Sequence, residues 1–260
     1  MLRDYLRLLK TFHQVQLSMA LKSPVNLWTS TLIQIVYYFA QWLFWLGIRS
    51  TDAGLKWLSQ KELIAFLVTV ALVDNVYLFL IGRGSMVLLQ RIQSRTLEGF
   101  LLWPRSTLGT LVWVSPNWTY FPCVVLSLLA FFAYHIWQNS SLGLIAMHFA
   151  ASMIGVFIMN GISFLFRMTG FWSLAFARIR HANPSYKIMV RPYNAFDPMV
   201  RLALLVVFPA LFITGVPAEI ASGRFGLIWL LAAIGALALL WIQVWFMWRK
   251  GLGRYGRLVS

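Results

Sequence analysis

Few side chains in this sequence could carry out acid–base, nucleophilic or metal chemistry. Its 260 residues include seven Asp and Glu, four His and one Cys. A catalytic site needs several such groups close together, whereas the histidines are scattered along the chain at His13, His135, His148 and His181. The spacings HExxH, CxxC and GxSxG do not occur. We therefore predict no catalytic residue and no metal site, with a membrane-embedded hydrolase or transferase as the alternative.

Asp74 is the acidic residue that lies well inside an apolar block, and Asn75 follows it. An ionisable group within a membrane helix is costly and often marks a functional site, such as the carboxylate of a proton-coupled transporter. We favour a structural role, through a hydrated position or through pairing with Arg83 or Arg91. Asp74 and Asn75 are kept as a possible intramembrane polar site.

The chain has no GxxxxGK[ST] phosphate cradle. Without that loop it cannot hold ATP in the P-loop manner. We expect this chain to bind no cofactor of its own, so an ATP-driven role would require a separate ATP-binding subunit.

Residues 91–104, RIQSRTLEGFLLWP, combine large apolar side chains with charges in a polar stretch between two apolar blocks. In protein contacts, apolar anchors supply affinity and a charged rim sets the register. This pattern predicts a short helix that docks onto a soluble partner, and the alternative is an ordinary basic loop. The predicted docking residues are Arg91, Ile92, Arg95, Leu97, Glu98, Gly99, Phe100, Leu101, Leu102 and Pro104.

The elements that carry these residues are membrane helices. Hydrophobic residues make up 60% of the chain and charged residues only 11%, whereas a soluble domain has about 25% charged residues. The apolar residues come in blocks long enough to cross about 30 Å of hydrocarbon as helices. We predict an all-α polytopic membrane protein with a single domain over residues 1–260. The six predicted spans cover about residues 25–48, 63–81, 108–134, 142–166, 199–216 and 225–248.

Residues 1–22 place Leu6 and Leu9 on one helical face and Arg7 and Lys10 on the opposite one. This segregation predicts an amphipathic helix that lies in the membrane interface or packs on other protein. Cys123 falls inside an apolar block and is expected to be a small buried residue.

The basic residues give the orientation. Eighteen of the 22 Lys and Arg residues fall on one side of the six spans, including a polar region over residues 167–197 and the position Arg201. The positive-inside rule therefore predicts that both termini are cytoplasmic. Because the net charge of +15 is spread over the gaps between apolar blocks instead of forming one stripe, we expect no nucleic-acid partner.

Several short motifs resemble those of ABC transporter permeases of the type-2 exporter class, in particular the small bacterial six-span permeases encoded with a separate ATPase and often a second permease. The run Thr96-Leu97-Glu98-Gly99, followed by Leu101-Leu102 and Pro104, resembles the cytoplasmic motif of that class. The amphipathic N-terminal helix agrees with it. So do three further runs: Val207-Phe208-Pro209-Ala210, Val216-Pro217-Ala218 and Gly253-Arg254-Tyr255.

The resemblance implies a permease in the bacterial inner membrane that exports a substrate by alternating access. Its partners would be membrane lipid, two copies of an ABC ATPase that holds ATP and Mg, and a second permease, sibling or identical. Residues 91–104 would be the coupling helix, and residues 217–224 an outer re-entrant element, with Pro209, Pro217, Glu219 and Arg224 as its marked residues. Two alternatives stay open: a proton-coupled secondary transporter that uses Asp74, and a membrane assembly protein without transport.

Overall fold

The computed structural model describes residues 2–50, 59–101, 107–113, 116–173 and 184–259, without the side chains of residues 2–9, 12, 100, 101, 113, 184, 185 and 257–259. Within these ranges the chain forms helices and no strand. Five segments of this described part are long and apolar enough to cross a membrane. The predicted class, an all-α polytopic membrane protein, is confirmed.

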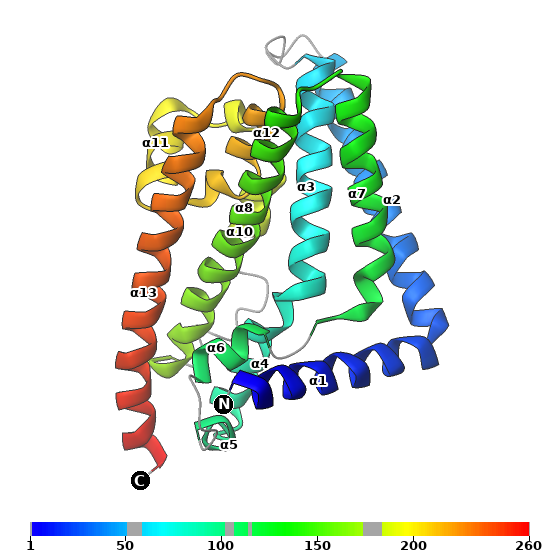
Figure 1. Ribbon diagram of the computed structural model, residues 1–260. Coiled ribbons are helices and arrows are strands. Elements are labelled where there is room, and N and C mark those ends of the chain that lie inside the picture. Colours follow the sequence, from blue (N-terminus) through cyan, green and yellow to red (C-terminus); the bar gives the residue numbers. More distant parts are fainter. Residues whose placement is uncertain (1, 51–58, 102–106, 114–115, 174–183, 260) are drawn as a thin grey trace.

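The long helices run along a common direction (Figure 1). They are α2 (Pro24–Ser50), α3 (Gln60–Leu80), α7 (Phe121–Trp137) with the short helix η1 (Trp118–Tyr120) before it, α8 (Leu142–Met168) and α13 (Leu227–Val259). Four of the predicted spans match α2, α3, α8 and the first part of α13. The predicted span 108–134 divides into α6 (Thr107–Trp113) and η1–α7, on either side of Pro116.

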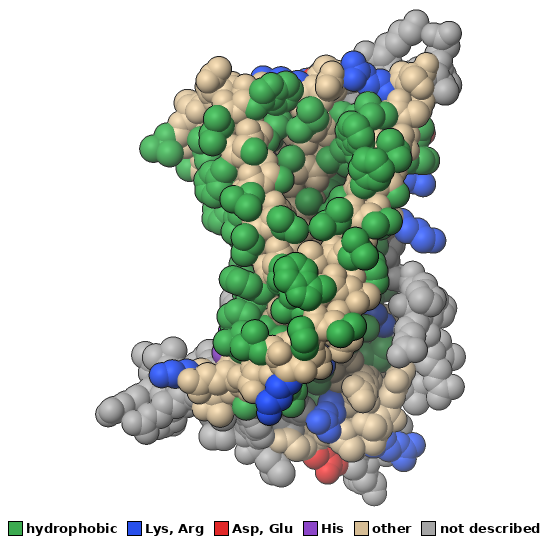
Figure 2. Space-filling view, turned by 90° about the vertical axis from the view of Figure 1, so that its right-hand side faces the viewer, with side chains coloured by type: hydrophobic (Ala, Val, Ile, Leu, Met, Phe, Trp, Pro, Cys, Tyr) green, Lys and Arg blue, Asp and Glu red, His purple; other side chains and the backbone are tan. Residues whose placement is uncertain are grey.

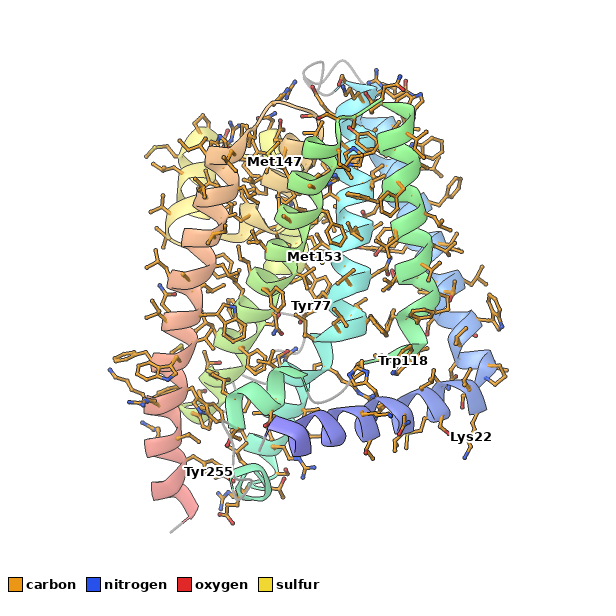
Figure 3. The ribbon with its side chains drawn as sticks, viewed as in Figure 1. Lys22, Tyr77, Trp118, Met147, Met153 and Tyr255 are labelled. Carbon is orange, nitrogen blue, oxygen red and sulfur yellow. The ribbon has the colours of Figure 1, made fainter. Side chains whose placement is uncertain are left out.

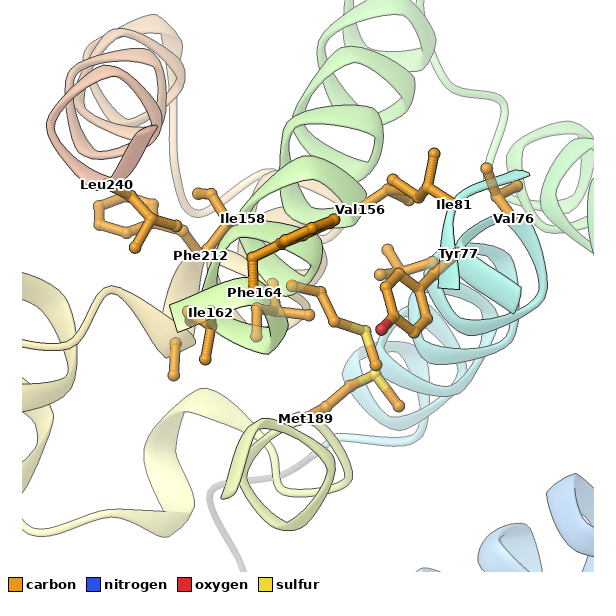
Figure 4. Close-up of a cluster of buried hydrophobic side chains, with 14 of the residues drawn as sticks. Val76, Tyr77, Ile81, Val156, Ile158, Ile162, Phe164, Met189, Phe212 and Leu240 are labelled. Atoms are coloured by element: carbon orange, nitrogen blue, oxygen red, sulfur yellow. The ribbon is translucent and has the colours of Figure 1, made fainter. Parts of the chain in front are cut away.

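Helix α8 lies at the centre of the core. Side chains from α3, α13 and the segments after α8 converge on it, including Tyr77, Phe212 and Leu240 (Figure 4). A Cβ atom added at Gly155 of α8 would collide with the carbonyl oxygen of Ile213. The backbone of that later segment therefore rests directly on α8, which a larger residue at this position would prevent.

One end of the bundle holds the amphipathic elements (Figure 1). Helix α1 (Leu2–Lys22) lies across the bundle axis there, as expected for a helix in the membrane surface. The helices α4 (Gly82–Gln93) and α5 (Glu98–Leu101) and the end of α13 lie at the same end. We refer to this end as the α1 end. Both chain termini lie at it, as the prediction of two termini on one side requires.

The predicted fifth span, residues 199–216, is not a continuous helix. The chain instead forms α10 (Pro184–Met189), η3 (Tyr193–Ala195), α11 (Pro198–Val206), η4 (Ala210–Phe212) and α12 (Gly215–Ala221). Pro209 follows α11 and has no N–H to continue the helical hydrogen bonds. The hydroxyl of Thr214, just before α12, donates to the Met189 carbonyl at 2.8 Å, so a side chain satisfies the carbonyl at the end of α10.

Arg201 of α11 lies at the end opposite α1, not with the basic residues of the α1 end as predicted. Its guanidinium is 4.7 Å from the centre of the Tyr193 ring. That ring packs at 5.3 Å from Phe225, just before α13 begins. This correction moves Arg201 to the side opposite α1, whereas Lys10, Arg83, Arg91 and Arg254 belong to elements at the α1 end.

The surface agrees with a lipid environment. On the face formed by α2 and α7, a band of hydrophobic side chains covers the middle, and Lys and Arg side chains lie above, below and beside it (Figure 2). Trp28, Phe39 and Phe44 of α2 are among the large exposed apolar side chains. Lipid tails can cover such a face without cost.

Candidate functional site

The docking segment begins where α4 ends, in a Schellman motif. The N–H of Thr96 donates to the Arg91 carbonyl at 3.0 Å, and the N–H of Arg95 donates to the Ile92 carbonyl at 3.3 Å. Arg95 sits in the left-handed region with φ of 55°. Two other helices of the described chain end in the same way, with Asn139 and Gly223 at the left-handed position. Asn and Gly adopt that conformation readily, whereas Arg does not, so the backbone at Arg95 is locally strained.

Two of the predicted docking side chains face inward. Leu97 is fully buried and Ile92 is 5% exposed, both in the main hydrophobic core. The expectation that they are anchors for a partner is corrected, because a side chain already covered by its own chain has no surface to offer. Their apolar character instead holds the segment against the bundle.

The remaining predicted residues divide into exposed and undescribed ones. The exposed ones are Arg91 and Arg95, before α5, and Glu98 and Gly99, within it. Phe100 and Leu101 are described only in their backbone, as part of α5, and Leu102 and Pro104 lie outside the described residues. The described surface of the segment is therefore polar and carries charges of both signs.

Tyr255 of α13 connects this segment to the bundle. Its hydroxyl accepts a hydrogen bond from the backbone N–H of Leu97 at 3.2 Å, and Tyr255 is 4% exposed (Figure 3). Its ring packs 6.3 Å from Phe171, which follows α8 in η2 (Thr169–Phe171). A Cβ at Gly251 would collide with the Phe171 ring. The glycine thus lets η2, α13 and the docking segment meet at one point.

The family follows from a comparison with known proteins. A family model described as ABC-2 family transporter protein matches residues 27–257. The chain belongs to the ABC-2 transporter family. Comparison with curated proteins and with solved structures gives no match. Membership makes this ABC-2 permease a multi-pass membrane component of a transporter, a class that is generally not catalytic.

The residues predicted to mark an outer re-entrant element lie together at the end opposite α1. Pro209 separates α11 from η4, and Pro217 lies in the first turns of α12. Glu219 accepts a hydrogen bond from the Asn194 amide at 3.3 Å and pairs with Arg224 at 3.5 Å.

Arg224 also pairs with Glu62, which forms a capping box with Ser59 at the start of α3. The element is therefore tied to a helix that lies early in the sequence. Burial raises the pKa of the Glu219 carboxyl, and the nearby Arg224 charge opposes that rise.

Asp74 has a different partner from the ones predicted. The Tyr38 hydroxyl of α2 donates to Asp74 Oδ2 at 3.0 Å, whereas Arg83 donates to Gln16 of α1 at 3.2 Å. Asp74 is 3% exposed, and its Oδ1 atom has no hydrogen-bond partner. Beside it, Tyr38 and Asn75 line a pocket of about 230 Å³ between α2, α3 and α7. The two residues of the predicted intramembrane polar site, Asp74 and Asn75, thus both lie next to the Tyr38 side chain. Cys123 lines the same pocket and is buried, as expected.

A second, larger pocket lies near the α1 end and was not predicted. It has a volume of about 560 Å³ and lies where α3 gives way to α4, beside η1, the end of α8 and α10. Arg83, Arg167 and Lys187 line it, together with the phenols of Tyr77, Tyr120 and Tyr186. The signal for this pocket in the sequence is the run Gly82-Arg83-Gly84, which places a cation between two glycines at the end of an apolar block.

The structure also joins two histidines that are far apart in the sequence. The hydroxyl of Thr69 donates to the Ala65 carbonyl at 2.7 Å, so it accepts from His148 Nε2 at 2.9 Å. His148 Nδ1 then accepts from His135 Nε2 at 2.9 Å, and His135 Nδ1 accepts from the Ser140 hydroxyl at 2.9 Å. Both imidazoles are neutral in this arrangement, because each has one donor and one acceptor nitrogen.

This histidine chain runs from the α7–α8 turn into the bundle. Sequence reasoning treated its members as unrelated, although two histidines on the arms of a predicted hairpin were a usable signal. Within the described residues, no group of three or more His, Cys, Asp or Glu is placed to hold a metal. The chain is best explained as a buried polar network that fixes how α3, α7 and α8 pack.

Proposed function

We propose that the chain is the membrane-spanning subunit of an ATP-driven exporter and that the segment from Arg91 to α5 docks a separate ABC ATPase. The observation that carries the proposal is the contact between Leu97 and Tyr255. It joins a segment with exposed charges on one side to the longest helix of the bundle on the other. Membership of the ABC-2 family and the missing phosphate cradle support the division of labour.

In this proposal the ATPase holds ATP and Mg, and this chain holds neither. Two ATPase subunits act on a pair of permeases, either two copies of this chain or this chain and a sibling. ATP binding draws the ATPases together, and the docking segment passes that movement to α13 and, through Phe171, to the end of α8. The coupling works only if the ATPase binds the two membrane conformations with different free energies.

The exporter would lie in a bacterial inner membrane with both termini in the cytoplasm. The α1 end would then face the ATPase, and the re-entrant element of Glu219 and Arg224 would lie on the outer side. The basic side chains of the α1 end support this orientation. A reporter fused after Ser260 should be active only in a cytoplasmic form, and one inserted at Asn139 only in a periplasmic form.

The docking test reverses charges at the exposed part of the segment. We expect Arg95→Glu combined with Glu98→Lys to lower the amount of ATPase that co-purifies about tenfold, because reversed rim charges face like charges on the partner. Lys250→Glu on α13, at the same end of the molecule, is the matched control and should leave recovery unchanged. Full recovery of the ATPase with the double variant would show that this surface is not the dock.

A secondary transporter is the second candidate, favoured by the unpartnered Oδ1 atom of the buried Asp74. Asp74→Asn separates the two functions, since the amide keeps the shape and can still accept from Tyr38 but carries no charge. Transport energised by ATP should survive this change in an ABC exporter. Loss of transport at normal expression would instead favour proton coupling through Asp74.

A further inference from the structure

The pocket lined by Arg83, Arg167 and Lys187 carries an inference about the ligand. We propose that this pocket binds the phosphate-bearing head group of an anionic amphiphile that enters from the membrane leaflet beside α1. The inference deepens the proposed function: that the ligand is the exported substrate rests on the exporter proposal. Binding itself does not depend on an ATPase.

The charge of the pocket selects an anion. Among the described residues of its wall are three cationic side chains and neither Asp nor Glu. The Asp74 charge acts on the lining tyrosines, but its carboxylate accepts a hydrogen bond from Tyr38 and does not line the pocket. Two guanidinium groups and an ammonium group suit a phosphate, since Arg binds two phosphate oxygens at once.

Helix α4 adds to this preference. It begins at Gly82, on the pocket wall, and the N-cap residue before it, Ile81, makes no side-chain hydrogen bond to the helix start. The N–H groups of a helix start attract anions, and here no side chain of the N-cap occupies them. A Cβ atom at Gly82 would meet the Tyr77 ring and carbonyl at 3.1 Å, so the glycine keeps the backbone close to the pocket.

The Tyr186 phenol completes the polar side. The Tyr77 hydroxyl donates to Ser163 at 3.0 Å and the Ser163 hydroxyl donates to the Met159 carbonyl at 2.8 Å, so these two lining hydroxyls can only accept from a ligand. Burial and the neighbouring Asp74 charge raise the pKa of Tyr186, so its phenol stays protonated and can donate to an anion.

The remaining wall indicates an amphiphile and not a free ion. Leu78 and Met86 lie on it beside the aromatic rings. A volume of about 560 Å³ is far larger than a phosphate group requires and is within the usual range for a small organic ligand.

The pocket also borders the amphipathic helix α1. Arg83 is bonded to Gln16, and His13 packs 6.2 Å from Trp118 of η1 (Figure 3). A ligand that lies in the leaflet at the level of α1 is therefore next to the cationic wall.

The test measures binding to the purified permease alone, in a neutral detergent, by isothermal titration calorimetry. The probes are hexyl phosphate, hexanol and inorganic phosphate. We expect hexyl phosphate to bind more tightly than either of the others. Arg167→Gln and Lys187→Gln should each raise its dissociation constant about tenfold, the loss of one charge-assisted contact. Lys250→Gln, which removes a cation that packs on Phe246 of α13, is the matched control and should change nothing.

Competition separates the possible sources of the ligand. If phosphatidylglycerol in nanodiscs displaces hexyl phosphate and phosphatidylcholine does not, the ligand is a membrane lipid or a lipid-linked compound. Displacement by inorganic phosphate at similar concentration would assign the site to soluble phosphate compounds and overturn the amphiphile. Equal binding of hexyl phosphate to all variants, or equal binding of hexanol, would overturn the anion site.

Lys187 and Arg83 are exposed, so Lys187→Gln and Arg83→Gln decide the outcome if Arg167→Gln does not fold. Because no ATPase is present in the assay, a negative result leaves the docking proposal standing. A failed docking test likewise leaves the binding result intact.

Discussion

The backbone N–H of Leu97 donates a hydrogen bond to the hydroxyl oxygen of Tyr255, at 3.2 Å and across 158 positions of sequence. Both residues are buried, so water cannot replace the bond. Through it, the turn that carries Arg95 and Glu98 is held by the last turns of α13. A partner that pulls on the exposed side chains therefore acts on α13 through this polar contact and the apolar packing around it.

Tyr255→Phe removes this hydroxyl and leaves the ring in place. The buried N–H of Leu97 then has no acceptor, which costs about 1–3 kcal/mol of stability. We expect a lower thermal unfolding midpoint in detergent and a loss of transport-stimulated ATP hydrolysis, with the ATPase still bound. Tyr255→Leu should lower stability further, because it also removes the ring contact with Phe171. Coupled hydrolysis at the wild-type rate in the Phe variant would show that the contact does not transmit movement.

Gly84 allows α4 and α6 to touch. A Cβ atom at this position would collide with the carbonyl oxygen of Leu111. Gly84→Ala must separate the two helices, at a cost of about 1–3 kcal/mol. Gly99 has no atom within 4 Å of the Cβ position and has no positive φ, so Gly99→Ala is the matched control within the docking segment. Thermal unfolding of the two variants should differ clearly, and equal midpoints would contradict the close approach of α4 and α6.

Arg95→Gly should stabilise the protein, by about 1 kcal/mol, because glycine adopts the left-handed conformation without the penalty that Arg carries. The same substitution at Gln90, an exposed helical position five residues earlier, should destabilise it by about 1 kcal/mol. The opposite signs are the test, measured as unfolding midpoints of the two variants. A destabilising Arg95→Gly would mean that the Arg side chain has a structural role that outweighs the strain.

Substitutions in the histidine chain should lower the stability of the protein more at its buried end than at its outer end. Thr69→Val leaves the Nε2–H of the fully buried His148 without an acceptor, at a cost of about 1–3 kcal/mol. Ser140→Ala removes the outermost member, where water can substitute, and should cost less than about 1 kcal/mol. Unfolding midpoints of the two variants measure the difference. A larger loss for Ser140→Ala would contradict the direction of donation derived for the chain.

Much of the fold could be predicted from local patterns. The boundaries of α2, α3 and α8 lie within a few residues of the predicted spans, because the length of an apolar block and the side on which cations fall are properties of each segment alone. The segment 1–22, predicted as an amphipathic helix, forms α1 across the bundle axis. The side chains of Leu6 and Leu9 on its apolar face lie outside the described residues. The third and fifth predicted spans, 108–134 and 199–216, were the exceptions, because neither is a continuous helix. Pro209 has no N–H to continue the helical hydrogen bonds, so the predicted fifth span breaks between α11 and η4.

The sequence by itself determined that this is a helical membrane protein with a basic end and a segment over residues 91–104 that combines charges with large apolar side chains. Tertiary structure decided which side of that segment is free, since Leu97 turned inward to Tyr255 and left Arg95 and Glu98 outside. It also decided that His135 meets His148, and that three distant cations share one pocket. The physical reason is that partition into lipid acts on each helix separately, whereas contacts between helices depend on their rotation and separation. Close approaches such as that of Gly84 to Leu111 set these, and they exist only in the packed bundle.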